Sequence, residues 1–382
     1  MKRFANLLLM IFSLLITLGM VEVGLRLMKY PSVFKRGQTF PVEVDRAWHI
    51  TCDDILGCAF DASHARSLGG RFAQINPQGF YDTDAFSEDA LPSAETFKVL
   101  LLGDSFTFGA AAEMGQSFAE RLEADLAQQT TLTVWNSGIP GTGTNNALIQ
   151  AQRFIPIMQP DVVILGIYSN DYADNLLPVE AYYADWLGKY AVAPDLEIIE
   201  LTPEAAFYRN YGVFPPANRA QFMMGRTRVG SLVMRTVDGF QEGGLSQIAM
   251  IDAWQFPEDW WQSTYFEAGI QQTQAYVEQI HTLTQAQGIP LVILAIPYVD
   301  DVKEAYDPNH PYAQAYHATV AIAQEVGATL ADPRPLLTES DYVPLPNGHW
   351  NNEGHAKVAE LLHACLRPLL DGNPLPSVCP NQ

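Results

Sequence analysis

Short apolar runs alternate with segments in which apolar residues recur every three or four positions over much of the chain. Runs such as Asp161–Ile167 are apolar on both faces, which is typical of strands in a parallel sheet. Segments such as Gln116–Gln128, with Phe118, Leu122 and Leu126 four residues apart, predict amphipathic helices. The predicted strands are Val99–Leu102, Leu132–Trp135, Asp161–Ile167, Leu291–Ile296 and Ala328–Leu330, and the predicted helices are Gln116–Gln128, Asn146–Phe154, Phe266–Gln287, Tyr312–Val326 and Glu353–Leu370.

This alternation predicts an α/β fold, a three-layer α/β/α sandwich with a central parallel sheet and helices on both faces. We expect this domain at residues 96–372, after a turn-rich lead-in at 29–95 and before a C-terminal tail at 373–382. The rhythm is lost at about 176–265, a stretch rich in Tyr, Trp and Phe, which we interpret as an insertion. Its aromatic residues either form a lid or substrate wall, or pack a small core of their own.

The N-terminus is the most hydrophobic part of the chain. Only three polar residues interrupt the stretch Phe4–Val21, which follows Lys2 and Arg3. The stretch is apolar on all faces and close to the ~20 residues that span a bilayer core. The two cations hold the N-terminus in the cytoplasm, so the rest of the chain is exported. A cleaved signal peptide is the alternative, but no clear small-x-small cleavage site follows, so we favour a transmembrane anchor over residues 1–28.

The net charge of the chain disfavours some classes of binding partner. Among 382 residues, 43 Asp and Glu outweigh 22 Lys and Arg, for a net charge of −21. An acidic surface argues against binding to nucleic acid and against docking on anionic lipid. The hydrophobic content of 48% is sufficient for one large core.

The four cysteines fall into two close pairs, Cys52 with Cys58 and Cys365 with Cys379. Neither pair has Cys-x-x-Cys spacing and no histidine cluster lies near them, so we expect no metal site. In an oxidising compartment two local disulfides are the simplest pairing. Four cysteines allow three connectivities, and the long-range ones stay open.

Residues able to carry chemistry gather in four short motifs. In the first, Ser105 follows a buried strand directly, and open α/β sheets place their chemistry at that end of their strands. The motifs are Gly103-Asp-Ser-Phe, Asn136-Ser-Gly-Ile-Pro-Gly141, Gly166-Ile-Tyr-Ser-Asn-Asp171 and Gly348-His-Trp-Asn-Asn-Glu-Gly-His355.

In this order the four motifs resemble the SGNH/GDSL hydrolase family, and in particular its membrane-anchored bacterial members. The resemblance covers roughly residues 76–175 and 266–370. It implies a flavodoxin-like α/β/α sandwich and ester hydrolysis at a serine, without a cofactor.

The resemblance also assigns roles to individual residues. It implies that Ser105 is the nucleophile and His349 the general base. The oxyanion hole would consist of the Ser105 N–H, the Gly141 N–H and the side-chain amide of Asn170. We expect Asp171 to be structural, and His355 to cap or support the last helix.

One position departs from the family pattern. The family usually has an Asp two or three residues before the catalytic histidine, whereas this chain has Pro346 and Asn347 there. Loss of a triad carboxylate can lower turnover by about 10⁴-fold. Either a Ser–His dyad operates, or another residue such as Asp104, Asp341 or Asp332 orients the imidazole, or the site is degenerate. We favour a working site, because the other motif residues persist.

Three hypotheses on function follow. The first is an exported, membrane-anchored esterase, periplasmic or extracellular, that acts on a small-molecule ester or an acylated glycan. The second is an O-acyltransferase acting on a cell-envelope or secreted polysaccharide, because aromatic side chains can stack on sugars. The third is a catalytically degenerate carbohydrate-binding module.

Overall fold

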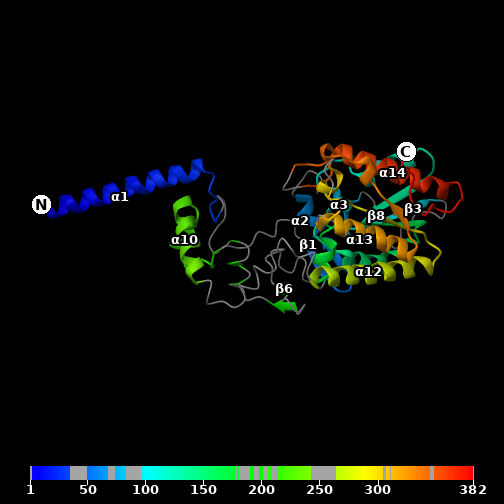
Figure 1. Cartoon of the computed structure of the whole chain (residues 1–382), viewed down its shortest axis with the longest axis horizontal. Coiled ribbons are helices and arrows are strands. Elements are labelled where there is room, and N and C mark those ends of the chain that lie inside the picture. Colours follow the sequence, from blue (N-terminus) through cyan, green and yellow to red (C-terminus); the bar gives the residue numbers. More distant parts are fainter. Residues whose placement is uncertain are drawn as a thin grey trace. The chain divides into compact units, whose positions relative to one another are not determined.

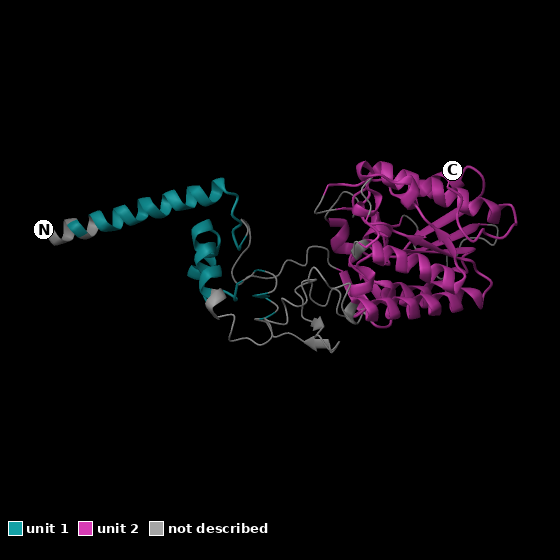
Figure 2. Cartoon of the chain, in the orientation of Figure 1, with its two compact units in different colours: residues 1–46, 185–257 teal, residues 47–184, 258–382 magenta. Residues whose placement is uncertain are grey.

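A computed structural model describes most of the chain and divides it into two compact units (Figure 2). Unit 1 consists of residues 1–46 and 185–257, and unit 2 of residues 47–184 and 258–382. The described residues are 2–34, 50–67, 74–82, 96–177, 179, 190–192, 198–200, 205, 207–208, 211, 213–241, 264–303, 307–309, 311–344 and 348–381.

Unit 2 is built on a five-stranded parallel sheet in the order β4-β3-β5-β8-β9. The parallel sheet confirms the predicted fold class. β3 lies between β4 and β5, and Leu101 of β3 pairs with Asn136 of β4 and with Ile164 of β5. The strands are β3 (Phe97–Leu102), β4 (Leu132–Asn136), β5 (Val162–Ile167), β8 (Leu291–Ala295) and β9 (Thr329–Ala331).

Helices cover both faces of this sheet, as predicted (Figure 1). On one face, Val99 and Leu101 of β3 share a hydrophobic cluster with α4 and α14. The intervening Leu100 and Leu102 are also fully buried, because the opposite face is covered by α5, α12 and α13. The helices are α4 (Phe118–Leu126), α5 (Thr144–Met158), α12 (Thr264–Gln285), α13 (Pro311–Val326) and α14 (Asn352–Leu370). The three-layer sandwich is thus formed by elements within a few residues of those expected.

Short elements at the ends of the strands complete unit 2. They are β1 (Ile50–Asp53), β2 (Gly57–Phe60), α2 (Ala62–Ser67), α3 (Ser105–Phe108), α6 (Asp171–Asp174), η4 (Val299–Val302), η5 (Arg334–Leu336) and η6 (Glu339–Asp341).

Two local disulfides are present in unit 2. Cys52 and Cys58 face each other across the β1–β2 hairpin. Cys365 of α14 is bonded to Cys379 in the C-terminal tail. The tail also runs beside β9, where Leu330 N donates to Ser377 O and Cys379 N donates to Leu330 O. Of the three possible connectivities, the structure therefore has the one between sequence neighbours.

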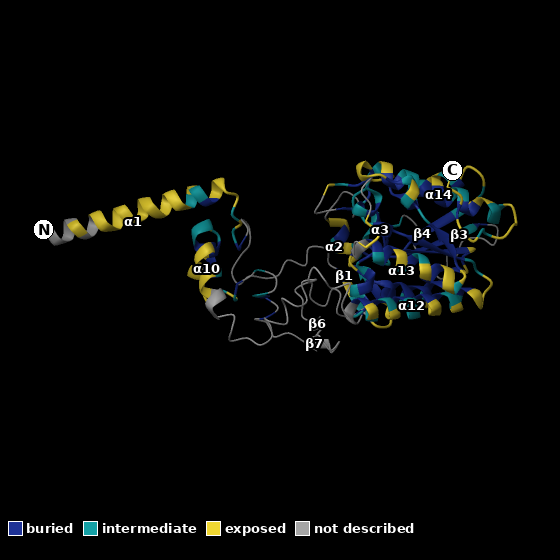
Figure 3. Cartoon of the chain, viewed as in Figure 1, coloured by how far each residue is buried: buried dark blue, intermediate teal, exposed yellow. Residues whose placement is uncertain are grey.

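Unit 1 contains α1 (Lys2–Leu27), a hairpin of β6 (Tyr190–Val192) and β7 (Ile198–Glu200), α9 (Arg219–Gly225) and α10 (Arg228–Gln241). Its small core brings Val33 and Phe34 together with Phe207, Val213, Phe222 and Met234. One stretch of α1, Leu9–Leu27, is long and apolar enough to cross a membrane by length and composition, and its side chains are almost all exposed (Figure 3). Phe207 shows that part of the aromatic insertion packs into a core of its own. Seven aromatic residues of the insertion, including all four of its tryptophans, lie outside the described residues.

Candidate active site

Ser105 is the first residue of α3, and only Gly103 and Asp104 separate it from the end of β3. The side chain of Asp104 caps this short helix, since its Oδ1 accepts a hydrogen bond of 2.9 Å from Phe106 N. Gly103 has φ +149°, and a Cβ at this position would lie 2.3 Å from Oγ1 of Thr107. Only glycine fits this turn, which places the Ser105 hydroxyl at the carboxyl edge of the sheet.

Ser105 is hydrogen-bonded to His349. Nε2 of His349 lies 2.7 Å from Oγ of Ser105, and both residues are half-buried. The imidazole packs against the ring of Phe106, with 4.8 Å between the ring centroids. The His349 backbone is fixed as well, because its carbonyl accepts a hydrogen bond of 2.8 Å from Val343 N. A nucleophile and a base within hydrogen-bond reach are what acyl transfer to a serine requires.

The second motif is hydrogen-bonded to the turn that carries Ser105. Nδ2 of Asn136 donates to the carbonyl of Thr107 over 2.8 Å, and Oδ1 of Asn136 accepts from Gly138 N over 3.0 Å. A Cβ on Gly138 would lie 2.5 Å from Phe108 N, so glycine permits this close approach. Gly141, farther along the same loop, is exposed and has φ +71°. The motif thus sets the loop that carries Gly141 against the segment that carries Ser105.

The third motif follows β5. Nδ2 of Asn170 donates to Oδ2 of Asp174 over 2.6 Å. Its Oδ1 is buried, and no hydrogen-bond donor reaches it among the described residues. Asp171 accepts hydrogen bonds from Oγ1 of Thr144 (2.8 Å) and from Tyr168 N (3.0 Å). It therefore ties the motif to the start of α5.

Sheet topology explains why these motifs meet. β4, β3 and β5 are neighbouring parallel strands, so the loops that follow them leave the same edge of the sheet. These loops carry Gly141, Ser105 and Asn170. The chain passes from β3 to β4 on one side and returns to β5 on the other, which makes this edge a topological switch point, where open α/β sheets bind ligands.

Three carboxyl groups near the site have raised pKa values. Burial raises the pKa of Asp104 to about 6, against the opposing effect of the Phe106 N–H. Burial and the neighbouring Asp104 charge raise the pKa of Asp174 to about 7, while the hydrogen bond from Asn170 opposes the rise. Burial, together with Asp104, also holds the pKa of Asp171 well above its usual range. The protonation of Asp104 and Asp174 therefore changes over the pH range in which many enzymes work.

The other acids considered for orienting His349 have different partners in the structure. The Asp341 carboxylate accepts from Thr338 N (2.7 Å), Thr338 Oγ1 (2.9 Å) and Lys357 Nζ (2.7 Å). These bonds give Asp341 a structural place in the turn at η6. Oδ1 of Asp332 accepts from Arg334 N over 2.9 Å. Asn347, like Pro346, lies outside the described residues.

His355 is buried, and its Nδ1 accepts a hydrogen bond of 3.2 Å from Phe118 N at the start of α4. It thus links α14 to α4. Among the residues described, no group of three or more His, Cys, Asp or Glu side chains could hold a metal ion.

Sequence reasoning missed Phe106 and Asp174. A signal existed for each: Phe106 directly follows the candidate nucleophile Ser105, and Asp174 lies four residues after Asn170 at the start of a helical turn, where i and i+4 side chains meet.

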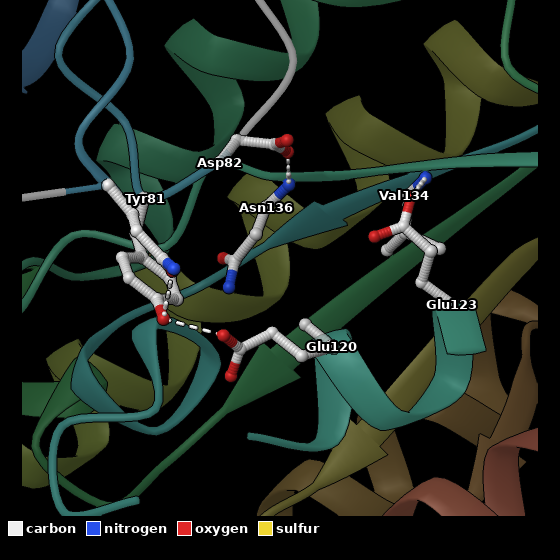
Figure 4. Close-up of a pocket in the computed structure, with 8 residues that line it drawn as sticks. Tyr81, Asp82, Glu120, Glu123, Val134 and Asn136 are labelled. Atoms are coloured by element: carbon white, nitrogen blue, oxygen red, sulfur yellow. Dashed lines mark hydrogen bonds between the residues drawn. The ribbon is translucent and has the colours of Figure 1, made fainter. Parts of the chain in front are cut away.

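A small polar recess of about 50 Å³ lies beneath the second motif (Figure 4). Figure 4 shows Tyr81 pointing toward Glu120 and Asp82 toward the backbone of Asn136. The Tyr81 hydroxyl donates to Oε1 of Glu120 over 2.6 Å, and Asn136 N donates to Oδ2 of Asp82 over 2.9 Å. Four hydrogen bonds, from Tyr81, Gly115 N and the N–H and hydroxyl of Ser117, offset burial and keep the pKa of Glu120 below its usual range. The hydrogen bonds around the recess hold the segment before β3 against α4 and against the second motif.

The chain was compared with protein families, with curated proteins and with solved structures. The family described as GDSL-like Lipase/Acylhydrolase matches residues 99–362, which is more than half of the chain. No curated protein matches the chain.

Solved structures similar to this chain include TesA (14% identity, 71% of this chain and 99% of that chain, TM-score 0.39). Esterase EstA from Pseudoalteromonas sp. is also similar (12% identity, 72% and 98%, TM-score 0.39). A catalytic mutant of Axe2, an acetylxylan esterase from Geobacillus stearothermophilus, is a third (13% identity, 76% and 99%, TM-score 0.39).

Proposed function

Because this chain belongs to the GDSL-like lipase/acylhydrolase family and is therefore an ester-hydrolysing enzyme, we propose that Ser105 is its nucleophile and His349 its general base. The observation that carries the proposal is the distance of 2.7 Å between Oγ of Ser105 and Nε2 of His349. A base this close can take the hydroxyl proton as the serine attacks.

In the first half-reaction, Oγ of Ser105 attacks the ester carbonyl carbon while its proton moves to Nε2 of His349. The carbonyl π electrons move to oxygen and form a tetrahedral oxyanion. When the intermediate collapses, the bond to the alkoxy group breaks and His349 protonates the leaving alcohol. An acyl-Ser105 ester remains.

In the second half-reaction, water takes the place of the alcohol. His349 removes one water proton, the hydroxide attacks the acyl carbon, and a second oxyanion forms. Its collapse breaks the bond to Ser105 Oγ, which recovers the proton from His349. The products are one carboxylic acid and one alcohol, and the site returns to its starting state.

We assign the oxyanion hole to the Ser105 N–H, the Gly141 N–H and the amide of Asn170. The first N–H groups of a helix have no intrahelical acceptor, so the N–H of Ser105 is suited to this role. The loop of Gly141 and the turn of Asn170 leave the same sheet edge as Ser105. Each such donor is worth ~2.7–4 kcal/mol of transition-state stabilisation.

We propose that the site works as a Ser–His dyad. The contact with Phe106 and the hydrogen bond from Val343 N hold the ring and the backbone of His349. Asp341 has its carboxylate bound by Thr338 and Lys357, so the mechanism does not rely on it. The positions where the family usually has an Asp hold Pro346 and Asn347 in this chain, so turnover is expected to be slower than in a family member that has that carboxylate.

We further propose that α1 anchors the enzyme in a membrane, with unit 2 on the exported side. The length and hydropathy of Leu9–Leu27 support the anchor, and two disulfides support an oxidising compartment. Transfer of the acyl group to a sugar stays a prediction from the sequence, since all four tryptophans of the insertion lie outside the described residues.

Hydrolysis of p-nitrophenyl acetate by the full chain in detergent micelles tests the proposal. We expect Ser105→Ala and His349→Ala each to abolish the burst and the steady rate, because each removes half of the pair. His317→Ala and Ser67→Ala, which replace exposed residues, are the matched controls. A fluorophosphonate should add its mass to the wild type and not to Ser105→Ala. Unchanged hydrolysis in either site variant would rule out this mechanism, and a wild type that neither hydrolyses nor is labelled would indicate a degenerate site.

A further inference from the structure

The end of the apolar helix α1 is bonded to the insertion of unit 1. Oε2 of Glu22 accepts hydrogen bonds from Arg228 N (2.8 Å) and Val229 N (2.9 Å) at the start of α10. Oε1 of the same carboxylate pairs with Nε of Arg26, one turn along α1. The guanidinium of Arg235 lies 5.5 Å from the ring of Tyr30, just past the end of α1. These contacts fix α10 at the C-terminal end of the stretch that could cross a membrane.

α10 runs across the end of α1 rather than alongside it (Figure 1). A helix that crosses a bilayer stands near the membrane normal, with a typical tilt of about 20°. A second helix fixed across its end therefore lies close to the plane of the membrane surface. The depth of α10 is also set, because Glu22 and Arg26, in the last turns of Leu9–Leu27, are the first charged residues after the uncharged run Phe4–Val21.

The outward face of α10 is apolar. Leu232, Val233 and Val237 are 38%, 43% and 49% exposed and, with the exposed Thr236, follow the i, i+1, i+4, i+5 spacing of one helix face. The opposite side of the helix places Met234 and Ser231 in the core of unit 1. Met223 and Met224 of the preceding helix α9 are exposed as well. α10 thus packs one face on the core of unit 1. Its second apolar face is not covered by any of the described residues.

Charge distinguishes this part of the chain from the rest. The whole chain carries −21, but segments 22–34 and 213–241 together hold six basic residues and only two acidic ones. The basic residues are Arg26, Lys29, Arg219, Arg226, Arg228 and Arg235. The whole-chain charge, which argues against contact with anionic lipid, therefore does not describe this local surface.

We propose that α9 and α10 form a second membrane contact, in which the apolar face of α10 lies in the headgroup region of an anionic bilayer. An exposed apolar stripe on a helix that also carries arginines is the pattern of interfacial helices. Basic side chains add attraction to anionic headgroups. The proposal rests on the membrane anchoring by α1 that we propose above. It makes the bilayer the occupant of the apolar face, because α10 is hydrogen-bonded to the C-terminal end of α1, the helix proposed to cross that bilayer.

Depth-dependent fluorescence quenching tests this contact. All four cysteines are in disulfides, so a new cysteine is the only free thiol to label. We would attach an environment-sensitive fluorophore to Val233→Cys, to Ile16→Cys in α1 and, as the matched control, to Ala321→Cys on the exposed face of α13. The full chain would be reconstituted in vesicles of phosphatidylglycerol and phosphatidylcholine that carry a nitroxide near the headgroup or near the end of the acyl chain.

We expect the headgroup nitroxide to quench position 233 strongly and position 321 not at all, whereas the chain-end nitroxide quenches position 16. Leu232→Gln with Val237→Gln should remove the quenching at position 233, since both residues are exposed and their replacement leaves the core intact. Quenching at position 16 with only aqueous iodide quenching at 233 would overturn the surface contact but not the anchor. Lipid quenching at neither position would overturn both, and nitrophenyl acetate hydrolysis reports the enzyme separately. Equal quenching at position 233 in vesicles of pure phosphatidylcholine would contradict the proposed attraction between the arginines and anionic headgroups.

Discussion

The side-chain amide of Asn170 donates to the carboxylate of Asp174, with 2.6 Å between Nδ2 and Oδ2. A carboxylate accepts and does not donate, so an ionised Asp174 selects the orientation in which the NH₂ group of Asn170 faces it. One N–H of that group is used, and the other stays available for an oxyanion. We therefore propose Asp174 as a positioning residue for Asn170, the proposed oxyanion donor, as distinct from a residue that touches the substrate.

Asp174→Asn should lower kcat by roughly tenfold and leave KM nearly unchanged, because the amide loses the charge that fixes its orientation but substrate contacts remain. Steady-state kinetics on p-nitrophenyl acetate measure both. Asp371→Asn, an exposed acid, is the matched control. If Asp174 acts through Asn170, its substitution has little further effect in an Asn170→Ala background. Additive losses in the double variant would mean that Asp174 acts through some other group.

The pH dependence of kcat should carry the signature of Asp174. Its pKa is raised to about 7, so the carboxylate that holds the amide is formed as pH rises through that value. We expect kcat to rise through this range in the wild type, and that part of the rise to disappear in Asp174→Asn. The rest of the profile should be the same in both proteins. Superimposable profiles would show that the ionisation of Asp174 does not affect turnover.

The contribution of Asp174 to folding stability should fall as pH rises, whereas its contribution to kcat should increase. A carboxyl group with a raised pKa binds more protons when folded than when unfolded, so it favours the folded state at low pH. For Asp174 this stabilisation is full below its usual pKa of 3.8 and is lost as pH rises toward about 7. Urea unfolding of the wild type and Asp174→Asn at several pH values should show the variant gaining in relative stability between these limits. A constant difference would contradict the raised pKa.

Gly138→Ala should cost about 1–3 kcal/mol of unfolding free energy, because the new Cβ would lie 2.5 Å from Phe108 N. Activity should fall more than stability predicts, since the same contact sets the Gly141 loop against the nucleophile turn. Chemical denaturation and initial rates provide the two measurements. Gly288→Ala is the control: that glycine has φ +70° but no neighbour within 4 Å, so only backbone strain is added. Equal effects on activity at both sites would contradict a specific role for Gly138.

Removal of the Cys365–Cys379 disulfide should destabilise the protein by ~3 kcal/mol, because a loop of about 15 residues is no longer closed in the unfolded chain. The Cys52–Cys58 bridge closes a shorter loop, so its loss should cost about 2 kcal/mol. Double Cys→Ser variants, compared by urea unfolding, measure each. A larger loss for Cys52–Cys58 would show that native contacts of the hairpin outweigh loop entropy.

Much of the fold was predictable because its signals are local. β5 is apolar at every position, and the α4 helix repeats its apolar residues every four positions, so strand and helix types followed from periodicity. The ends were less well placed: α5 begins two residues earlier than predicted and continues past Pro156 to Met158, because its packing between the sheet and α12 overrides the local preference.

The sequence by itself determined the alternation of strands and helices, the apolar N-terminal helix and the candidates Ser105 and His349, since each is a property of neighbouring residues. Only the tertiary structure decided that His349 reaches Ser105 across 244 positions of chain, and that Asp341 is engaged by Thr338 and Lys357. It alone gathered the basic residues of segments 22–34 and 213–241 around the end of α1. Distance between side chains depends on how the chain is folded back on itself, and neither composition nor periodicity records that.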